Sequence, residues 1–451
     1  MSLTGTWKSR GYGWVLDLNP AGYSLFDVIP GTGVEFERGS MDEFEQGFEV
    51  LDDAASDVLQ LRVRHDITAY AFDRIDRIPD AMLRLEDPRR PDALQSFDFF
   101  CSVFENDYAF FEHKKVDWPA LCAAARSRVS AQTKPEELLR VFGDLILPLA
   151  DNHVVVSDGR DTLISDKIAE VKQTVSDELG LHGHRIGDPA NVDIIGRFIQ
   201  QEFLPTGGRQ AGNGAVHWGM LEDGIAYLNV IRMFGLADTA DARTADDLPP
   251  RRPDHARFLE QDLAAIDAIL DDVMADIATA RALVLDVRLN GGGFDKLGML
   301  IANRLADRRR LAFTKHARDG EGFTERQAFH IEPSGDLRFT RPVYLLTSAR
   351  TASAGDVFAL CMRALPHVTI VGQPSTGILS DNLRKHLPNG WYTSISNEYY
   401  CAADGQLFEG PGVPVDVETP VFVPGDFRAG YHRAVDAAVA LAHSHVVRPS
   451  A

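Results

Sequence analysis

Residues 1–90 contain short runs in which apolar and polar positions alternate, which is the period of a half-buried strand. Such runs lie at 11–18, 58–63 and 69–72, and Asn19-Pro20-Ala21-Gly22 after the first of them has the composition of a turn. We therefore predict a small antiparallel sheet or barrel in this part of the chain.

Between residues 95 and 150 the apolar period becomes helical. Aromatic side chains cluster in 97–111, which is typical of a helical core. Thr133 and Glu136 have the spacing of a capping box, and apolar positions in 138–149 continue a helix from there. Residues 160–220 read as helix and then loop, while the polar, proline-containing stretch 236–256 reads as a surface loop or lid.

Four apolar runs in the second half of the chain predict buried strands, at 225–231, 282–287, 342–346 and 368–371. Helical patterns separate them, including a long one at 257–278. Short continuous apolar strands that alternate with helices indicate an α/β core. The pattern as a whole divides the chain into an N-terminal β-rich domain (1–92), a helical segment (93–220) and an α/β core (221–445).

Composition agrees with a globular protein, since 45% of the 451 residues are hydrophobic and 25% are charged. The net charge of −20 argues against nucleic acids and anionic membrane surfaces as partners, because both require basic patches. No apolar run reaches the ~18 residues of a membrane-spanning helix. The N-terminus lacks a signal-peptide pattern, so we expect a cytoplasmic location, or a periplasmic or secreted one if a leader has been removed.

Cysteine and histidine spacings do not predict a metal site. Cys101, Cys122 and Cys361 lie in apolar patterns and are expected to be buried free thiols. His182 and His184 form a pair without carboxylates at a suitable spacing, which favours a surface loop. We expect neither a metal nor a cofactor.

Ser353 lies where the apolar run 342–346 gives way to Thr-Ala-Ser-Ala-Gly-Asp and then to a helical period. The apolar face of this helix consists of Val357, Phe358, Cys361, Ala364 and Leu365. The first amides of a helix have no intrahelical partner, so a hydroxyl placed there can attack a carbonyl while amides receive the oxyanion. Serine is also a common N-cap, and the junction alone leaves both roles open.

Other motifs of the core have a fixed order around Ser353. The strand at 282–287 leads into Asp-Val-Arg-Leu-Asn-Gly-Gly-Gly (286–293), whose glycines let the backbone approach a ligand. Gly-Gln-Pro-Ser-Thr-Gly (372–377) and Glu-Gly-Pro-Gly-Val-Pro-Val-Asp (409–416) follow downstream.

In this order the motifs resemble those of the C-terminal-processing and tricorn-core serine protease family. Residues 105–111 and Leu-Ala-Asp-Asn-His (149–153) also resemble segments of that family, so the resemblance spans roughly 95–420. It implies an α/β fold with a crotonase-like (ClpP-like) protease core preceded by a helical segment. The N-terminal β domain lies outside it.

The family uses either a Ser-Lys dyad or a tricorn-like set of Ser, His and Glu. The lysine of the first branch is absent, because Gly377-Ile378-Leu379 occupies its position and Lys385 is off the pattern. The resemblance to the second branch implies Ser353 as nucleophile, His153 as general base and Glu409 as the residue that orients it.

Two residues are secondary candidates for supporting the histidine. Asn152 stands where the tricorn-like branch has a serine, and Glu398 competes with Glu409 as the orienting carboxylate. His386 becomes a candidate base only if His153 is remote from Ser353. Imidazole can take and return a proton near neutral pH, which suits the base role.

The resemblance implies an oxyanion hole made by the amides of Gly292 and Ala354, and a peptide or protein substrate bound as an added strand. Two other functions stay open. One is a non-catalytic ligand-binding module, as in the retinoid-binding protein of photoreceptors, which has repeats of the same fold. The other is crotonase-like acyl-CoA chemistry.

Overall fold

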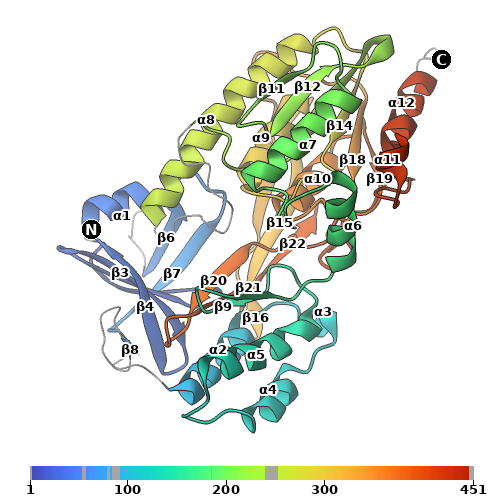
Figure 1. Ribbon diagram of the computed structural model, residues 1–451. Coiled ribbons are helices and arrows are strands. Elements are labelled where there is room, and N and C mark those ends of the chain that lie inside the picture. Colours follow the sequence, from blue (N-terminus) through green and yellow to red (C-terminus); the bar gives the residue numbers. More distant parts are fainter. Residues whose placement is uncertain are drawn as a thin grey trace.

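The computed structural model describes residues 3–52, 57–78, 82–83, 92–183, 185–238 and 252–445 (Figure 1). Most of the predicted lid, residues 239–251, lies outside these ranges, as does His184. Secondary structure in the described part is mixed, with several sheets and helices, as the sequence pattern predicts.

The strands of the N-terminal part form one sheet in the order β5-β6-β7-β1-β2-β3-β4-β8. Neighbouring strands are antiparallel except β4 and β8, which are parallel. The strands are β1 (Gly5–Ser9), β2 (Trp14–Asn19), β3 (Gly22–Ile29), β4 (Thr32–Gly39), β5 (Phe48–Asp52), β6 (Val58–Val63), β7 (Ala69–Ile75) and β8 (Met82–Leu83), with α1 (Met41–Gly47) between β4 and β5.

A helical segment packs against this sheet and shares its hydrophobic core. Its helices are α2 (Ala93–Asp107), α3 (Phe111–Lys114), α4 (Trp118–Arg126), α5 (Pro135–Ile146) and η1 (Leu147–Leu149). The predicted capping box of α5 is wrong. Pro135 is the first helical residue, which makes Lys134 the N-cap, and the Thr133 hydroxyl instead accepts a hydrogen bond from the Ser130 amide.

The second half of the chain is built on a sheet of order β11-β12-β13-β14-β18-β19-β23. From β13 to β23 its strands are parallel. They are β11 (Arg209–Ala211), β12 (Val216–Met220), β13 (Ile225–Val230), β14 (Ala282–Asp286), β18 (Val343–Thr347), β19 (Val368–Gly372) and β23 (Val417–Glu418). Every residue of β13, β14 and β18 is buried, which explains their continuous apolar sequences and confirms the predicted strands.

Helices surround the core sheet, and α10 and α12 both pack on its central strands (Figure 1). The remaining helices are α6 (Ala169–Leu179), α7 (Pro189–Glu202), η2 (Glu222–Gly224), α8 (Arg252–Asp276), α9 (Asp295–Leu305), α10 (Ala354–Arg363), α11 (Asp426–Ala429) and α12 (Arg433–His445). Contrary to the one-sided pattern expected after Ser353, α10 is buried on all sides from Ala354 to Met362, because it also contacts α9 and β15.

Two smaller sheets connect distant parts of the chain. One has the order β10-β9-β21-β20, so β9, which follows His153, pairs with β21 from the second half of the chain. The other joins β16, β17 and β22 to β15. Their bounds are β9 (Val155–Ser157), β10 (Thr162–Ile164), β15 (Arg310–Asp319), β16 (Gly322–Phe323), β17 (Gln327–Ile331), β20 (Asn382–His386), β21 (Tyr392–Ser396) and β22 (Glu398–Ala402).

All four cysteines are free thiols. Cys361 is buried as expected, and Cys401 is buried too. The expectation that Cys101 and Cys122 are buried is wrong, since both are partly exposed. No helix in the described ranges is long and apolar enough to cross a membrane.

Candidate active site

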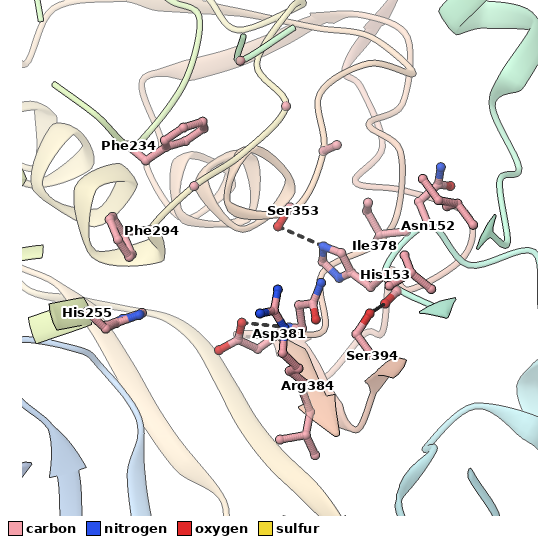
Figure 2. A pocket seen from close by; sticks show the side chains of 18 of the residues that line it. Asn152, His153, Phe234, His255, Phe294, Ser353, Ile378, Asp381, Arg384 and Ser394 are labelled. Carbon is pink, nitrogen blue, oxygen red and sulfur yellow. Dashed lines mark hydrogen bonds between the residues drawn. The ribbon is translucent and has the colours of Figure 1, made fainter. Parts of the chain in front are cut away.

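Ser353 and His153 meet although they lie 200 residues apart: Nε2 of the imidazole is 3.1 Å from the serine Oγ (Figure 2). This distance lies within the hydrogen-bond range expected of a nucleophile and its base. Ser353 follows β18, while His153 precedes β9. The pairing of β9 with β21 places the histidine loop beside a strand that follows Ser353 in the sequence.

His153 is 8% exposed, and hydrogen bonds to its backbone amide and carbonyl hold it in place. The buried carboxylate of Asp151 accepts hydrogen bonds from the His153 amide at 3.0 Å and from the Tyr108 hydroxyl at 3.0 Å. The Ser394 hydroxyl donates to the His153 carbonyl at 2.6 Å. The imidazole therefore projects from a loop that is anchored on both sides.

The other ring nitrogen of His153 fixes the tautomer. Nδ1 lies 2.7 Å from the carbonyl oxygen of Ser380, and a carbonyl can only accept. In the neutral ring the proton is therefore on Nδ1, which leaves Nε2 with a free lone pair toward the Ser353 hydroxyl. This is the tautomer that a general base requires.

Within the described residues, the Glu409 side chain forms no hydrogen bond with the imidazole of His153. Its Oε2 instead accepts from the amides of Leu379 and Ser380 at 2.7 and 3.0 Å. The carboxylate thus fixes the peptide whose carbonyl, on Ser380, receives His153 Nδ1. Burial is the main cause that raises the pKa of Glu409 to about 8, and the charge of Asp151 adds to it.

Neither secondary candidate supports His153. The Asn152 amide donates to Asp166 at 2.7 Å, and Figure 2 shows it directed away from the imidazole. Glu398 accepts from the Tyr12 hydroxyl at 2.6 Å and from Lys315 at 3.1 Å. The structure therefore corrects both expectations: each side chain satisfies its hydrogen bonds with other partners.

Ser353 has a strained backbone, with φ of 58° and ψ of −123°, at the N-terminus of α10. Such outliers persist only where the surroundings hold them, often at active sites. Here the buried carboxylate of Asp356 accepts from the Ser353 amide and from the Gly377 amide, both at 2.8 Å. One aspartate thus ties Ser353 to the loop that leads to Ser380.

The glycine loop 291–293 lies against Ser353. A Cβ on Gly292 would be 2.7 Å from the Ser353 Cβ and 3.1 Å from the Ala354 amide nitrogen. The Gly292 amide, however, already donates to the Asn290 side chain at 2.8 Å, so the expectation that it faces a substrate oxyanion is corrected. Ala354 is the first residue of α10, where an amide has no intrahelical acceptor.

Lys385 and His386 do not serve Ser353. The Lys385 ammonium is fully buried at 3.2 Å from Asp107 and 3.4 Å from Asp27, and it also donates to backbone carbonyls of the N-terminal sheet. His386 Nδ1 lies 2.9 Å from the Asp27 carboxylate. Both residues of β20 therefore hold the N-terminal part against the core.

A cavity of about 480 Å³ opens onto Ser353 and His153. Residues of the N-terminal part, of 152–188 and of the core line it together. Its size suits a few residues of a peptide or a small ligand. Within the described ranges, no group of three or more His, Cys, Asp or Glu side chains could hold a metal ion.

The sequence analysis missed two residues that shape this site. Asp356 had a signal, because Ser353 and Asp356 have the spacing of a helix capping pair. Ser380 had none, since it acts through its backbone carbonyl, and any residue supplies a carbonyl.

Comparison with known proteins agrees with the motifs. Residues 257–419 match the model of peptidase family S41. A carboxy-terminal-processing protease of Bartonella bacilliformis is 22% identical over 178 residues, which are 39% of this chain and 39% of that protein. The chain thus matches about two fifths of the length of this relative.

Solved structures show a similar fold. A candidate peptidase from Parabacteroides merdae aligns with a TM-score of 0.61 and 22% identity, over 78% of this chain and 96% of the other. Mature CPAF aligns with a TM-score of 0.51 and 12% identity, over 78% and 96%. The mixed α/β fold and the match of residues 257–419 to the model of peptidase family S41 agree with the motifs around Ser353.

Proposed function

We propose that this chain is a serine peptidase, which hydrolyses peptide bonds through an acyl-enzyme with Ser353 as nucleophile and His153 as general base. The contact between His153 Nε2 and Ser353 Oγ at 3.1 Å, with Nδ1 committed to the Ser380 carbonyl, is the observation that carries the proposal. The match of residues 257–419 to the model of peptidase family S41 gives further support.

In the proposed first step, Oγ attacks the substrate carbonyl carbon while His153 Nε2 takes the hydroxyl proton. The imidazolium then gives this proton to the leaving amine, and the carbon–nitrogen bond breaks to leave an ester on Ser353. Water repeats the sequence, releases the acid and restores both residues.

The surrounding residues have supporting roles in this proposal. Glu409 orients His153 indirectly, because it holds the peptide of Ser380. The amide of Ala354 is one oxyanion donor. Gly291 and Gly293 line the cavity, and we assign the second donor to the Gly293 amide in place of that of Gly292.

Labelling with a fluorophosphonate, combined with a peptide-hydrolysis assay, tests this function. We expect the probe to attach to Ser353 in the wild type, and Ser353→Ala and His153→Ala to lower kcat by about 10³-fold or more. Ser127→Ala, which changes an exposed serine outside the cavity, is the matched control.

Melting curves of the variants must match that of the wild type for the result to concern chemistry. Full hydrolysis by a folded Ser353→Ala variant would contradict the nucleophile. If the wild type is neither labelled nor hydrolytic but binds an apolar ligand in the cavity, the ligand-binding module replaces the peptidase.

The finer description of the fold is also a proposal. We propose a crotonase-like core and a division into residues 1–92, 93–220 and 221–445. Parallel strands β13, β14, β18 and β19 with intervening helices support the core, and limited proteolysis tests the division. A cytoplasmic location also stays a prediction.

A further inference from the structure

Asp381 presents a carboxylate to the cavity directly beside the catalytic pair. It follows Ser380, whose carbonyl holds His153, and it precedes β20. Figure 2 shows its side chain below Ser353 and His153, on the side of His255. The side chain is exposed, accepts one hydrogen bond from the Asn382 amide at 2.8 Å, and forms no ion pair with any described residue.

A second acceptor lines the same cavity, and it is buried. Asn397 is 1% exposed, and its Nδ2 donates to the Gly11 carbonyl at 3.0 Å. This bond fixes the amide orientation, because the flipped amide would set two carbonyl oxygens against each other. Its Oδ1 then has no hydrogen-bond partner in the part of the chain that the structure describes. A buried acceptor without a donor is costly, and an N–H group of a ligand would satisfy it.

Aromatic rings of the N-terminal sheet form a wall of this cavity. The Tyr12 ring lies 5.4 Å from that of Trp14 and 4.7 Å from that of Tyr70. Faces of such rings attract cations. The chain itself gives an example, since the guanidinium of Arg252 lies 5.3 Å from the Trp14 ring.

The other carboxylates that line the cavity, those of Asp66, Asp188 and Glu398, have basic partners. Lys315 pairs with Glu398 at 3.1 Å, and His255 lies 3.6 Å from Asp66. The Arg384 guanidinium lies 4.4 Å from the centre of the Tyr392 ring, and no ion pair joins it to Asp381 among the described residues. Asp381 is therefore the carboxylate that remains available to a ligand.

We infer that this end of the cavity selects peptides with a cationic group, which is an ammonium or a guanidinium. Asp381 forms an ion pair with this group, and Asn397 Oδ1 accepts a hydrogen bond from it. The inference rests on the proposed peptidase function. The lysine or arginine side chain of a peptide and its N-terminal amine have this chemistry in common, and the experiment below separates them.

The test compares peptides that differ only in arginine or citrulline at one scanned position, because citrulline keeps the shape of arginine and lacks its charge. For the best position we expect the wild-type kcat/KM to be about tenfold higher with arginine, mainly through KM. Asp381→Asn should bring this ratio close to one, and Asp381→Lys should favour a glutamate peptide. Asp193→Asn, which changes an exposed carboxylate on α7 outside the cavity, should keep the wild-type ratio.

Each peptide is also assayed with a free and an acetylated N-terminus. A preference for the free amine that Asp381→Asn removes would assign the site to the N-terminus of the substrate and would support the inference. The inference would be overturned if the wild type hydrolysed both members of every peptide pair at equal rates. It would also be overturned if Asp381→Asn kept the wild-type preference for the charged peptide. Hydrolysis of the citrulline peptide by way of Ser353 would still leave the proposed function intact.

Discussion

The buried carboxylate of Glu409 illustrates how single residues are tuned around the candidate site. Its Oε2 accepts from two amides, but its Oε1 has no hydrogen-bond partner among the described residues. Burial, with the nearby charge of Asp151, raises its pKa from 4.5 to about 8. The native state therefore favours the neutral acid, which changes the pH dependence of stability.

We expect the free energy of unfolding of the wild type to fall, relative to that of Glu409→Gln, as the pH rises from 4.5 to about 8. The stability due to the protonated acid is complete below the pKa of the unfolded state and is lost as the pH passes the raised native pKa. Glutamine is neutral at every pH and shows no such loss. Denaturant unfolding at pH 5, 7 and 9 measures this, and a constant difference between the two proteins would contradict the raised pKa.

At the scale of elements, the close contact between the loop after β14 and the N-terminus of α10 shapes the candidate site. The loop after β14 approaches α10 so closely that Gly292, with φ of +105°, has no room for a side chain beside Ser353. The sequence shows three glycines at this place but not which of them makes the approach.

Gly292→Ala should therefore lower activity at least ~100-fold and destabilise the fold by roughly 1–3 kcal/mol. The added Cβ would meet the Ser353 Cβ at 2.7 Å and would strain the left-handed backbone. Gly405→Ala is the matched control, since Gly405 has φ of +83° and open space around it. The control should cost stability alone; an equal loss of kcat/KM in both variants would refute the close contact.

At the scale of the whole molecule, a buried ionic cluster joins three parts of the chain. Lys385 of β20 lies between Asp27 of the N-terminal sheet and Asp107 of α2. Burial alone would raise the pKa of Asp27, but the charges of Lys385 and His386 outweigh it and hold this pKa below its ordinary value. The cluster therefore fixes the sheet that lines one side of the cavity.

Lys385→Met should destabilise the protein by about 3–5 kcal/mol, because it removes the buried cation that lies between the carboxylates of Asp27 and Asp107. Arg128→Met, which breaks the exposed pair with Asp144, should cost no more than about 1 kcal/mol. Thermal and denaturant melting measure both. If Lys385→Met melts like the wild type, the cluster does not anchor the N-terminal sheet.

The sequence by itself determined the buried core strands and the motifs that resemble a peptidase family. The buried strands β13, β14 and β18 were recognisable because continuous apolar runs reflect burial on both faces. The ordered motifs around Ser353 lie within residues 257–419, which match the model of peptidase family S41. Local patterns fail where neighbours compete, as at α5, where Pro135 displaced the capping residue expected from spacing alone.

Only the tertiary structure decided how His153 reaches Ser353 and what holds it there. The approach spans 200 residues and depends on strand pairing between β9 and β21, which no local period encodes. The Ser380 carbonyl carries no side-chain signal, the Gly292 amide is taken by Asn290, and Glu409 acts through a peptide. Backbone groups have the same chemistry at every residue, so their roles emerge only when folding places them.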